Sequence, residues 1–240
     1  MTPMSEPSAT THPRLPARRG GGAGTWWSKA VLRAVEEAAF GEKDLRVGRR
    51  LARAGAVGAI TVSEGGAVAA VSDGQDAFTV EVTVPVLDAA DAAAFVELVA
   101  AESGRIGALL AGQLPHSFVE AVEEAGVELL PYGGELGSAC SCDAWLDPCP
   151  HALTVLSQLA WMSQADPFVL IHLRGLARER VLRDLHRLVR QPTVEAPLDG
   201  ESPGDSTPSG SDDVDDLVVA EDAAVRAARL LRLESPFDAW

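Results

Sequence analysis

The sequence has little cysteine and no long run of apolar residues. Only three of its 240 residues are cysteine, and so small and odd a number argues against a disulfide framework. No stretch of about 18 apolar residues occurs, so we expect no membrane-spanning helix. The first 24 residues contain no apolar segment of the kind found in secretory signals. These absences predict a cytoplasmic protein.

The sequence also lacks the short motifs that mark common catalytic sites. It contains no P-loop, Rossmann glycine pattern, nucleophile elbow or H-E-x-x-H motif. Aromatic residues make up 5% of the chain and hydrophobic residues 47%, so Ala, Val and Leu must form most of the core. We therefore expect a globular protein that binds a partner and is not an enzyme.

Negative charge dominates the composition but is unevenly spread. The formal net charge is −15. From Pro192 onward, twelve acidic residues stand against three arginines, a net of −9. From Cys140 to Arg190, five acidic residues stand against six arginines, a net of +1. The overall acidity therefore does not exclude nucleic acid as a partner of the region between residues 140 and 190.

The spacing of apolar residues predicts an α+β fold. Helical spacing predicts helices over residues 26–38, 42–54, 87–102, 106–111, 115–125, 149–163 and 176–190. Alternation predicts strands over 57–63, 67–72 and 78–84, and the glycine-containing breaks between them fit a three-stranded antiparallel meander. Thr25 and Asp88 are the expected helix caps.

Composition divides the chain into four parts. Residues 1–24 are expected to form a disordered arm, and 25–130 a helical and small-sheet domain. Residues 131–190 hold the cysteines and the helices that follow them. Residues 191–240 form an acidic flexible tail, in which Leu217 to Leu233 can form a short helix.

The three cysteines lie together with one histidine. Within twelve residues the chain carries Cys140-Ser141-Cys142 and, after six residues, Cys149-Pro150-His151. Proline is favoured at the first helical position, which places Cys149 at a helix cap and His151 in the first turn. Positive charge at a helix N-terminus favours the thiolates that bind metals.

Three thiolates and one imidazole make the tetrahedral ligand set of structural zinc. We therefore predict that Cys140, Cys142, Cys149 and His151 bind one zinc ion, with no position left for a catalytic water. The alternatives are small buried cysteines beside an unrelated histidine, or a Cys–His nucleophilic pair, for which no orienting third group is evident.

The pattern C-x-C-x6-C-x-H resembles the SWIM zinc finger over residues Leu136 to Ala160. Thr25-Trp26-Trp27, and the basic stretch from Arg46 to Arg53 before a small sheet, also look like bacterial SWIM-containing proteins. The resemblance implies a ββα-like zinc unit with the same four ligands and with DNA-binding or protein-binding roles. It further implies association with a helicase-like ATPase.

Two arginine-rich helix faces are candidate surfaces for nucleic acid or a partner. The first comprises Lys43, Arg46, Arg50 and Arg53, and the second Arg180, Arg183, Arg187 and Arg190. Each set is spaced by three and four residues and can neutralise phosphates, although an ordinary solvated helix face also accounts for it. Trp145, between the ligands, either covers the sulfurs or is exposed for a partner.

The first functional hypothesis is therefore an adaptor whose zinc unit binds a protein, expected to be a helicase-like ATPase, in a DNA-related pathway. The alternative is direct DNA or other nucleic-acid binding through the zinc unit and the arginine faces. An enzyme has no support beyond the expected metal.

Overall fold

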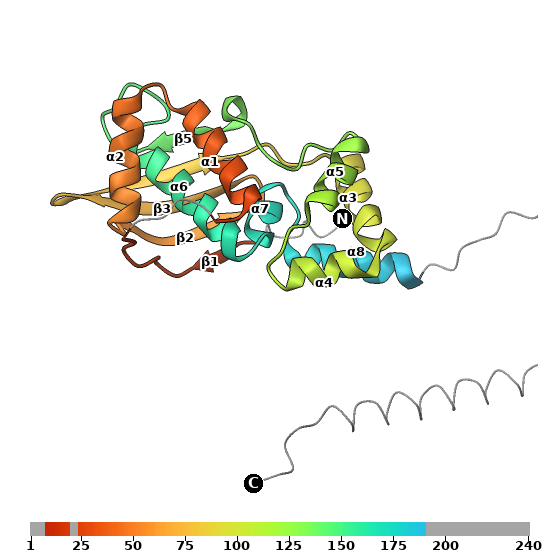
Figure 1. The fold of residues 1–240 in the computed structure, drawn as a ribbon. Coiled ribbons are helices and arrows are strands. Elements are labelled where there is room, and N and C mark those ends of the chain that lie inside the picture. Colours follow the sequence, from red (N-terminus) through yellow and green to blue (C-terminus); the bar gives the residue numbers. More distant parts are fainter. Residues whose placement is uncertain (1–7, 20–23, 191–240) are drawn as a thin grey trace, which may run out of the picture. The chain divides into compact units, whose positions relative to one another are not determined.

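A computed structural model describes residues 8–19 and 24–190 of the protein (Figure 1). The predicted tail and its helix over residues 217–233 lie outside these ranges. The described residues all belong to one compact unit. The elements, in chain order, are β1 Thr10–His12, α1 Trp26–Ala38, α2 Glu42–Arg53, β2 Val57–Ser63, β3 Gly66–Asp73, β4 Asp76–Thr83, α3 Ala89–Ala101, α4 Ser103–Leu110, α5 His116–Glu124, the 3-10 turn η1 Gly133–Glu135, β5 Gly137–Cys140, α6 Pro150–Ala165, α7 Phe168–Leu173 and α8 Arg178–Arg190.

The strands form one antiparallel sheet with the order β1-β2-β3-β4-β5. The predicted meander is confirmed as β2, β3 and β4, and the α+β class with it. Two outer strands were not expected. Strand β1 comes from the arm that composition predicts to be disordered, and it pairs through Thr10↔Val62 and His12↔Ile60. A strand of three residues is too short to show an alternating pattern.

Local signals placed the starts of α1 and α3 correctly, whereas α4 begins at Ser103, three residues before the predicted start. The Thr25 side chain accepts a hydrogen bond from the Ser28 N–H at 3.4 Å and caps α1. The Asp88 carboxylate accepts from the N–H groups of Ala90 and Asp91, both at 2.8 Å, and caps α3. These bonds satisfy amide groups that the first helical turn leaves without partners.

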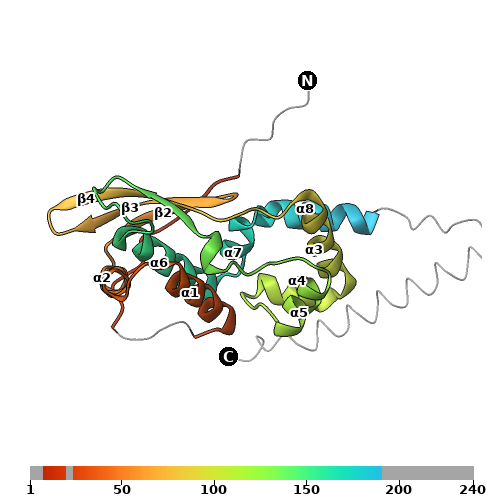
Figure 2. The same ribbon diagram turned by 90° about the horizontal axis from the view of Figure 1, so that it is seen from above.

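Helix α6 lies between the sheet and the helices α1 and α2 (Figures 1 and 2). Thirteen of its sixteen residues are buried, so it has no solvent-facing stripe. Its buried threonine, serine and glutamine side chains bond to backbone carbonyls, such as Thr154 to Pro150 O at 2.7 Å and Gln158 to Ala52 O at 3.1 Å. The helix that carries two of the predicted ligands is therefore part of the main core.

A second helical group, formed by α3, α4, α5 and α8, packs around its own apolar cluster. Helix α7 leads from α6 to α8, and the buried Arg174 follows it directly. The Arg174 guanidinium donates to Pro85 O at 2.8 Å and Glu128 O at 2.6 Å, which ties together the segments after β4 and α5. Burial lowers the pKa of Arg174. In the described ranges, no helix is long and apolar enough to cross a membrane.

The boundary predicted at residue 131 runs through a shared core. Val35, Val62 and Val82 from the first part pack in one cluster with Leu153 and Leu156 from the second. Strand β5 pairs with β4, whereas the ββα-like unit implied by the resemblance would take both strands from around residues 136–160. The cysteine region is therefore built onto the sheet of the preceding segment.

Candidate metal centre

The edge of the sheet positions the first two cysteines. Cys140 ends β5 opposite Val80 of β4, so both side chains point to the face that α6 covers. Ser141 continues the pairing with Thr79: its N–H donates to Thr79 O at 3.0 Å, and its Oγ accepts from the Thr79 N–H at 2.9 Å. Beyond Ser141 the chain leaves the sheet and brings Cys142 back toward Cys140.

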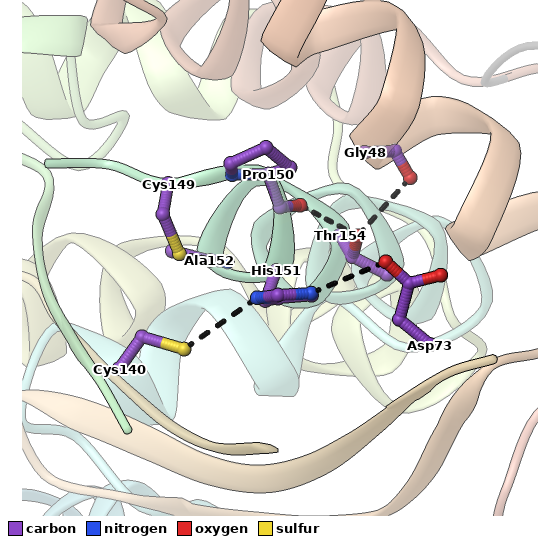
Figure 3. Close-up of polar contacts among 8 residues, drawn as sticks. All are labelled: Gly48, Asp73, Cys140, Cys149, Pro150, His151, Ala152 and Thr154. Atoms are coloured by element: carbon purple, nitrogen blue, oxygen red, sulfur yellow. Dashed lines mark hydrogen bonds and ion pairs between the residues drawn. The ribbon is translucent and has the colours of Figure 1, made fainter. Parts of the chain in front are cut away.

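The start of α6 positions the other two residues, as the sequence predicted. Cys149 is the N-cap residue, and its Sγ accepts a hydrogen bond from the Ala152 N–H at 3.5 Å. Pro150 occupies the first helical position, and His151 follows in the first turn. Figure 3 shows the side chains of Cys140, Cys149 and His151 turned toward one another beneath this turn.

The four predicted ligands converge on one point. One ligand atom from each of Cys140, Cys142, Cys149 and His151 lies within 4.8 Å of every other. Among the described residues this is the one group of three or more such side chains placed to hold an ion. Ligands at about 2.0–2.3 Å from a tetrahedral ion lie about 3.3–3.8 Å apart, so a small contraction would close the site. The Cys3His cluster can therefore bind a metal.

The imidazole of His151 is held from two sides. Its Nδ1 lies 3.8 Å from Cys140 Sγ, while its Nε2 lies 3.5 Å from Oδ2 of Asp73 (Figure 3). The Phe78 ring stacks on it, with centroids 4.3 Å apart and an interplanar angle of 21°. A carboxylate beside the second ring nitrogen favours the tautomer whose other nitrogen is free to bind a metal. The geometry thus directs Nδ1 toward the sulfurs.

Asp73 and Phe78 are neighbours of the cluster that the sequence did not predict. Asp73 stands in a segment assigned to a hairpin turn, and Phe78 begins an expected strand. Both are more than 70 residues before His151, so no spacing rule links them to the cluster. The packing of α6 on β3 and β4 brings them to its first turn.

The three thiols differ in acidity. Burial raises the pKa of Cys140 to about 12, with the neighbouring thiols adding to the effect, and burial also raises the pKa of Cys149. Burial acts in the same sense on Cys142, but hydrogen bonds from the Ala144 N–H and from His151 outweigh it and lower its pKa to about 7. Cys142 is therefore the most acidic of the three thiols and the one most readily deprotonated for metal binding.

A nucleophilic pair and a chance grouping of buried cysteines both fit this geometry less well than a metal site. Asp73 supplies the orienting group that a Cys–His nucleophilic pair needs, and nothing in the sequence indicated it. A nucleophilic pair, however, gives no reason for two further thiols within 4.8 Å. Unrelated buried cysteines would not bring the imidazole nitrogen among the sulfurs. Metal binding accounts for all four side chains together.

The loop between the ligands, residues 143–148, leaves Trp145 in solvent. Its side chain is 87% exposed, so it does not cover the sulfurs. The prediction that it covers the sulfurs is therefore wrong, and its exposure leaves a role in partner binding as a prediction. The C-terminal end of the loop is held against the rest of the fold, because the Asp147 carboxylate contacts the Ser138 hydroxyl and Pro148 is buried.

The first basic face is exposed along α2. Lys43, Arg46, Arg50 and Arg53 all face solvent, and none forms an ion pair within the described ranges. The arm adds exposed cations beside the helix end: Arg14 donates to Gly55 O at 2.8 Å, and the Arg18 N–H donates to Arg53 O at 2.8 Å.

The second basic face, on α8, is partly neutralised. Arg180 and Arg187 lie 3.8 and 3.1 Å from the Asp184 carboxylate, while Arg183 and Arg190 are exposed. Figures 1 and 2 show α2 and α8 at opposite ends of the described unit. The two faces therefore do not form one surface.

Comparison with known proteins identifies a relative whose own function is not characterised. The chain is 30% identical over 170 residues to an uncharacterized protein, Rv2102, of Mycobacterium tuberculosis (strain ATCC 25618 / H37Rv). The match covers 70% of this chain and 61% of that protein, so the chain spans less than two thirds of its relative. No family model matches the sequence, and no solved structure matches it.

Proposed function

We propose that the protein is a non-catalytic adaptor of the SWIM zinc-finger type, in which one zinc ion holds the start of α6 against the end of β5. The observation that carries the proposal is the convergence of three sulfurs and one imidazole nitrogen within 4.8 Å. Cysteine-rich ligand sets with one histidine are typical of structural zinc. Four protein ligands fill a tetrahedral shell and leave no position for a reacting water.

The position of the cluster supports a structural role. It joins two elements that are separate in the chain, and Cys149 is 4% exposed within the main core. The order of ligand types, C-x-C followed by C-x-H, supports the SWIM assignment. From that resemblance we infer a partner that is a helicase-like ATPase in a DNA-related pathway.

Elemental analysis of the full-length protein, purified without added metal, tests the first part of the proposal. We expect one zinc per chain, and less than a tenth of that in Cys142→Ser. The matched control is Ser117→Ala, which removes an exposed hydroxyl on α5 and leaves the cluster and its hydrogen bonds unchanged. A wild-type protein without metal, or equal zinc in Cys142→Ser, would contradict the proposal.

The adaptor role is tested by isolating the protein from its native cells at low salt. We expect an ATPase to co-purify with the wild type and to be absent from the Cys142→Ser preparation. Recovery of a partner-free monomer from the wild-type cells would count against the adaptor.

A second candidate, direct nucleic-acid binding, is favoured by the exposed face of α2, where Lys43, Arg46, Arg50 and Arg53 form no ion pair within the described ranges; Arg49 of the same helix pairs with Glu36. The face from Lys43 to Arg53 spans about 15 Å at 1.5 Å per residue, a length over which duplex DNA carries about nine phosphate charges. If three or four of these cations contact phosphates, the logarithm of affinity falls with the logarithm of salt concentration with a slope of about −3.

Because the faces lie apart, substitutions on them separate the two surfaces. Binding through α2 predicts that Arg46→Glu with Arg50→Glu weakens DNA affinity at least tenfold, while Arg183→Glu with Arg187→Glu changes it little. The reverse pattern would assign binding to α8. No effect of either pair, measured by fluorescence anisotropy at low salt, would exclude direct binding through these helices.

A further inference from the structure

Trp145 is the most exposed large apolar side chain in the described part of the protein. Its exposed fraction is 87%, against 82% for Val189 at the end of α8 and 74% for Phe40 between α1 and α2. A tryptophan can remove about 150–250 Å² of surface from water when it is covered. Tryptophan is also among the residues that contribute most to binding energy at protein interfaces.

The cluster limits the positions that Trp145 can take. Cys142 and Cys149 are ligand residues on either side of the loop, so a bound metal fixes both of its ends. The Ser138–Asp147 contact and the buried Pro148 add two further attachments. A side chain that is held before binding loses less conformational entropy when a partner covers it. A bound metal would therefore restrict the conformation of the loop before a partner binds.

The surroundings of Trp145 are acidic. Asp143 and Asp147 flank it in the loop and are exposed. Asp147 contacts the Ser138 hydroxyl, and within the described ranges neither carboxylate forms an ion pair with a lysine or arginine. Three thiolates and one Zn²⁺ would add a net charge of about −1.

Helix α2, which carries the first basic face, packs against α6. Gly48 of α2 packs on the other side of the first turn of α6 from the cysteines, as Figure 3 shows. Trp145, flanked by the exposed carboxylates of Asp143 and Asp147, suits a basic protein surface. It does not suit the phosphate backbone of a nucleic acid, which the carboxylates would repel.

We propose that Trp145, with Asp143 and Asp147, is the docking surface for a protein partner that presents an apolar pocket bordered by lysine or arginine. This inference rests on the proposed adaptor function and names the part of the zinc unit that carries it. Trp145 fills the pocket, and the two carboxylates pair with the basic border and set the orientation. Loss of the metal releases both ends of the loop and weakens docking.

Selection of short random peptides displayed on phage, against the immobilised zinc-loaded full-length protein, tests this inference. We expect the enriched peptides to combine an apolar cluster with two or more lysines or arginines. Synthetic copies should bind Trp145→Ala at least tenfold more weakly than wild type. Asp143→Asn with Asp147→Asn should weaken binding about threefold and reduce its salt dependence, since exposed charge pairs contribute little and are screened by salt.

Phe40→Ala is the matched control, because it removes another exposed aromatic residue that is not part of the ligand loop, and we expect no change in binding. The inference is overturned if no peptide is enriched, if the peptides lack basic residues, or if Trp145→Ala binds them as well as wild type. Zinc content is measured in every variant. If the wild-type protein contains no zinc, the proposed function is wrong. If Trp145→Ala contains zinc and binds the peptides with full affinity, only this inference is wrong.

Discussion

At the scale of single residues, the metal centre depends on how the imidazole of His151 is aimed. Cys140 approaches Nδ1, Asp73 approaches Nε2 and Phe78 covers the ring face. The ligands alone leave ring rotation and tautomer open, and the two neighbours from β3 and β4 restrict both. Residues that touch no metal thereby govern how well the site binds one.

Asp73→Ala should weaken zinc binding by about 10-fold to 100-fold, because removal of a carboxylate behind a ligating histidine has effects of that size. Asp73→Asn keeps a carbonyl oxygen that can accept from Nε2–H and should lose less. Asp76→Ala, across the same hairpin, should bind as wild type. Competition with a chromophoric chelator measures all three affinities, and equal affinities for Asp73→Ala and wild type would refute the positioning role.

Metal binding should release protons in a number that changes with pH. With its pKa raised to about 12, Cys140 is protonated at neutral pH in the metal-free protein, as is Cys149, whereas Cys142 titrates at about 7. Because the metal takes thiolates, affinity rises with pH. We expect the thiols to release about two protons per zinc near pH 8 and about three near pH 6.

Calorimetry in buffers of different ionisation enthalpy measures this release. A proton count that stays the same from pH 6 to pH 8 would show that Cys142 is no more acidic than the other two thiols.

At the scale of elements, the site depends on the close approach of α2 to α6. A Cβ added at Gly48 would lie 2.9 Å from the Leu153 Cβ and 3.0 Å from Pro150 O, both at the start of α6. The same first turn carries Cys149 and His151. Helix α6 can therefore pack this closely on α2 only because residue 48 has no side chain.

Gly48→Ala should destabilise the protein by about 1–2 kcal/mol, since overpacking outweighs the gain in helix propensity. Gly107→Ala is the matched control, because that glycine lies in exposed α4 and an added Cβ meets nothing within 4 Å. The control should stabilise by about 0.5–1 kcal/mol. Urea unfolding compares the two, and a stabilised Gly48→Ala would show that the helices can separate without cost.

At the scale of the whole molecule, the metal centre and the main core are one structure. Cys149 and Leu153 lie in the same apolar cluster as Val62 and Val82 of the sheet. Metal binding should therefore stabilise the sheet and α6 together, because a site that exists only in the folded chain adds its binding energy to folding.

Complete chelation should lower the midpoint of thermal unfolding by about 10 °C or more, because a few kcal/mol shifts a chain of this size by that amount. Hydrogen exchange should show lost protection in β4 and β5 as well as at the start of α6. An unchanged melting curve, with removal of the metal confirmed by elemental analysis, would show that the cluster does not stabilise the fold.

Local features of the protein follow from its sequence alone. The caps Thr25 and Asp88, the meander β2–β4 and the four candidate ligands are all set by neighbouring residues. The start of α6 is another such feature, because Pro150 suits the first helical position and no later one. Short-range hydrogen bonding and periodic burial leave clear patterns over a few residues, and these patterns can be read without a structure.

Features that join residues far apart in the chain depend on tertiary contacts. Such contacts pair Thr10–His12 and Gly137–Cys140 with the sheet as its edge strands. They also bring Asp73 and Phe78 to His151. They place the helices α2 and α8 at opposite ends of the described unit. They also leave Trp145 in solvent. Strand pairing and helix packing join segments tens of residues apart, and they leave no spacing in the sequence from which they can be read.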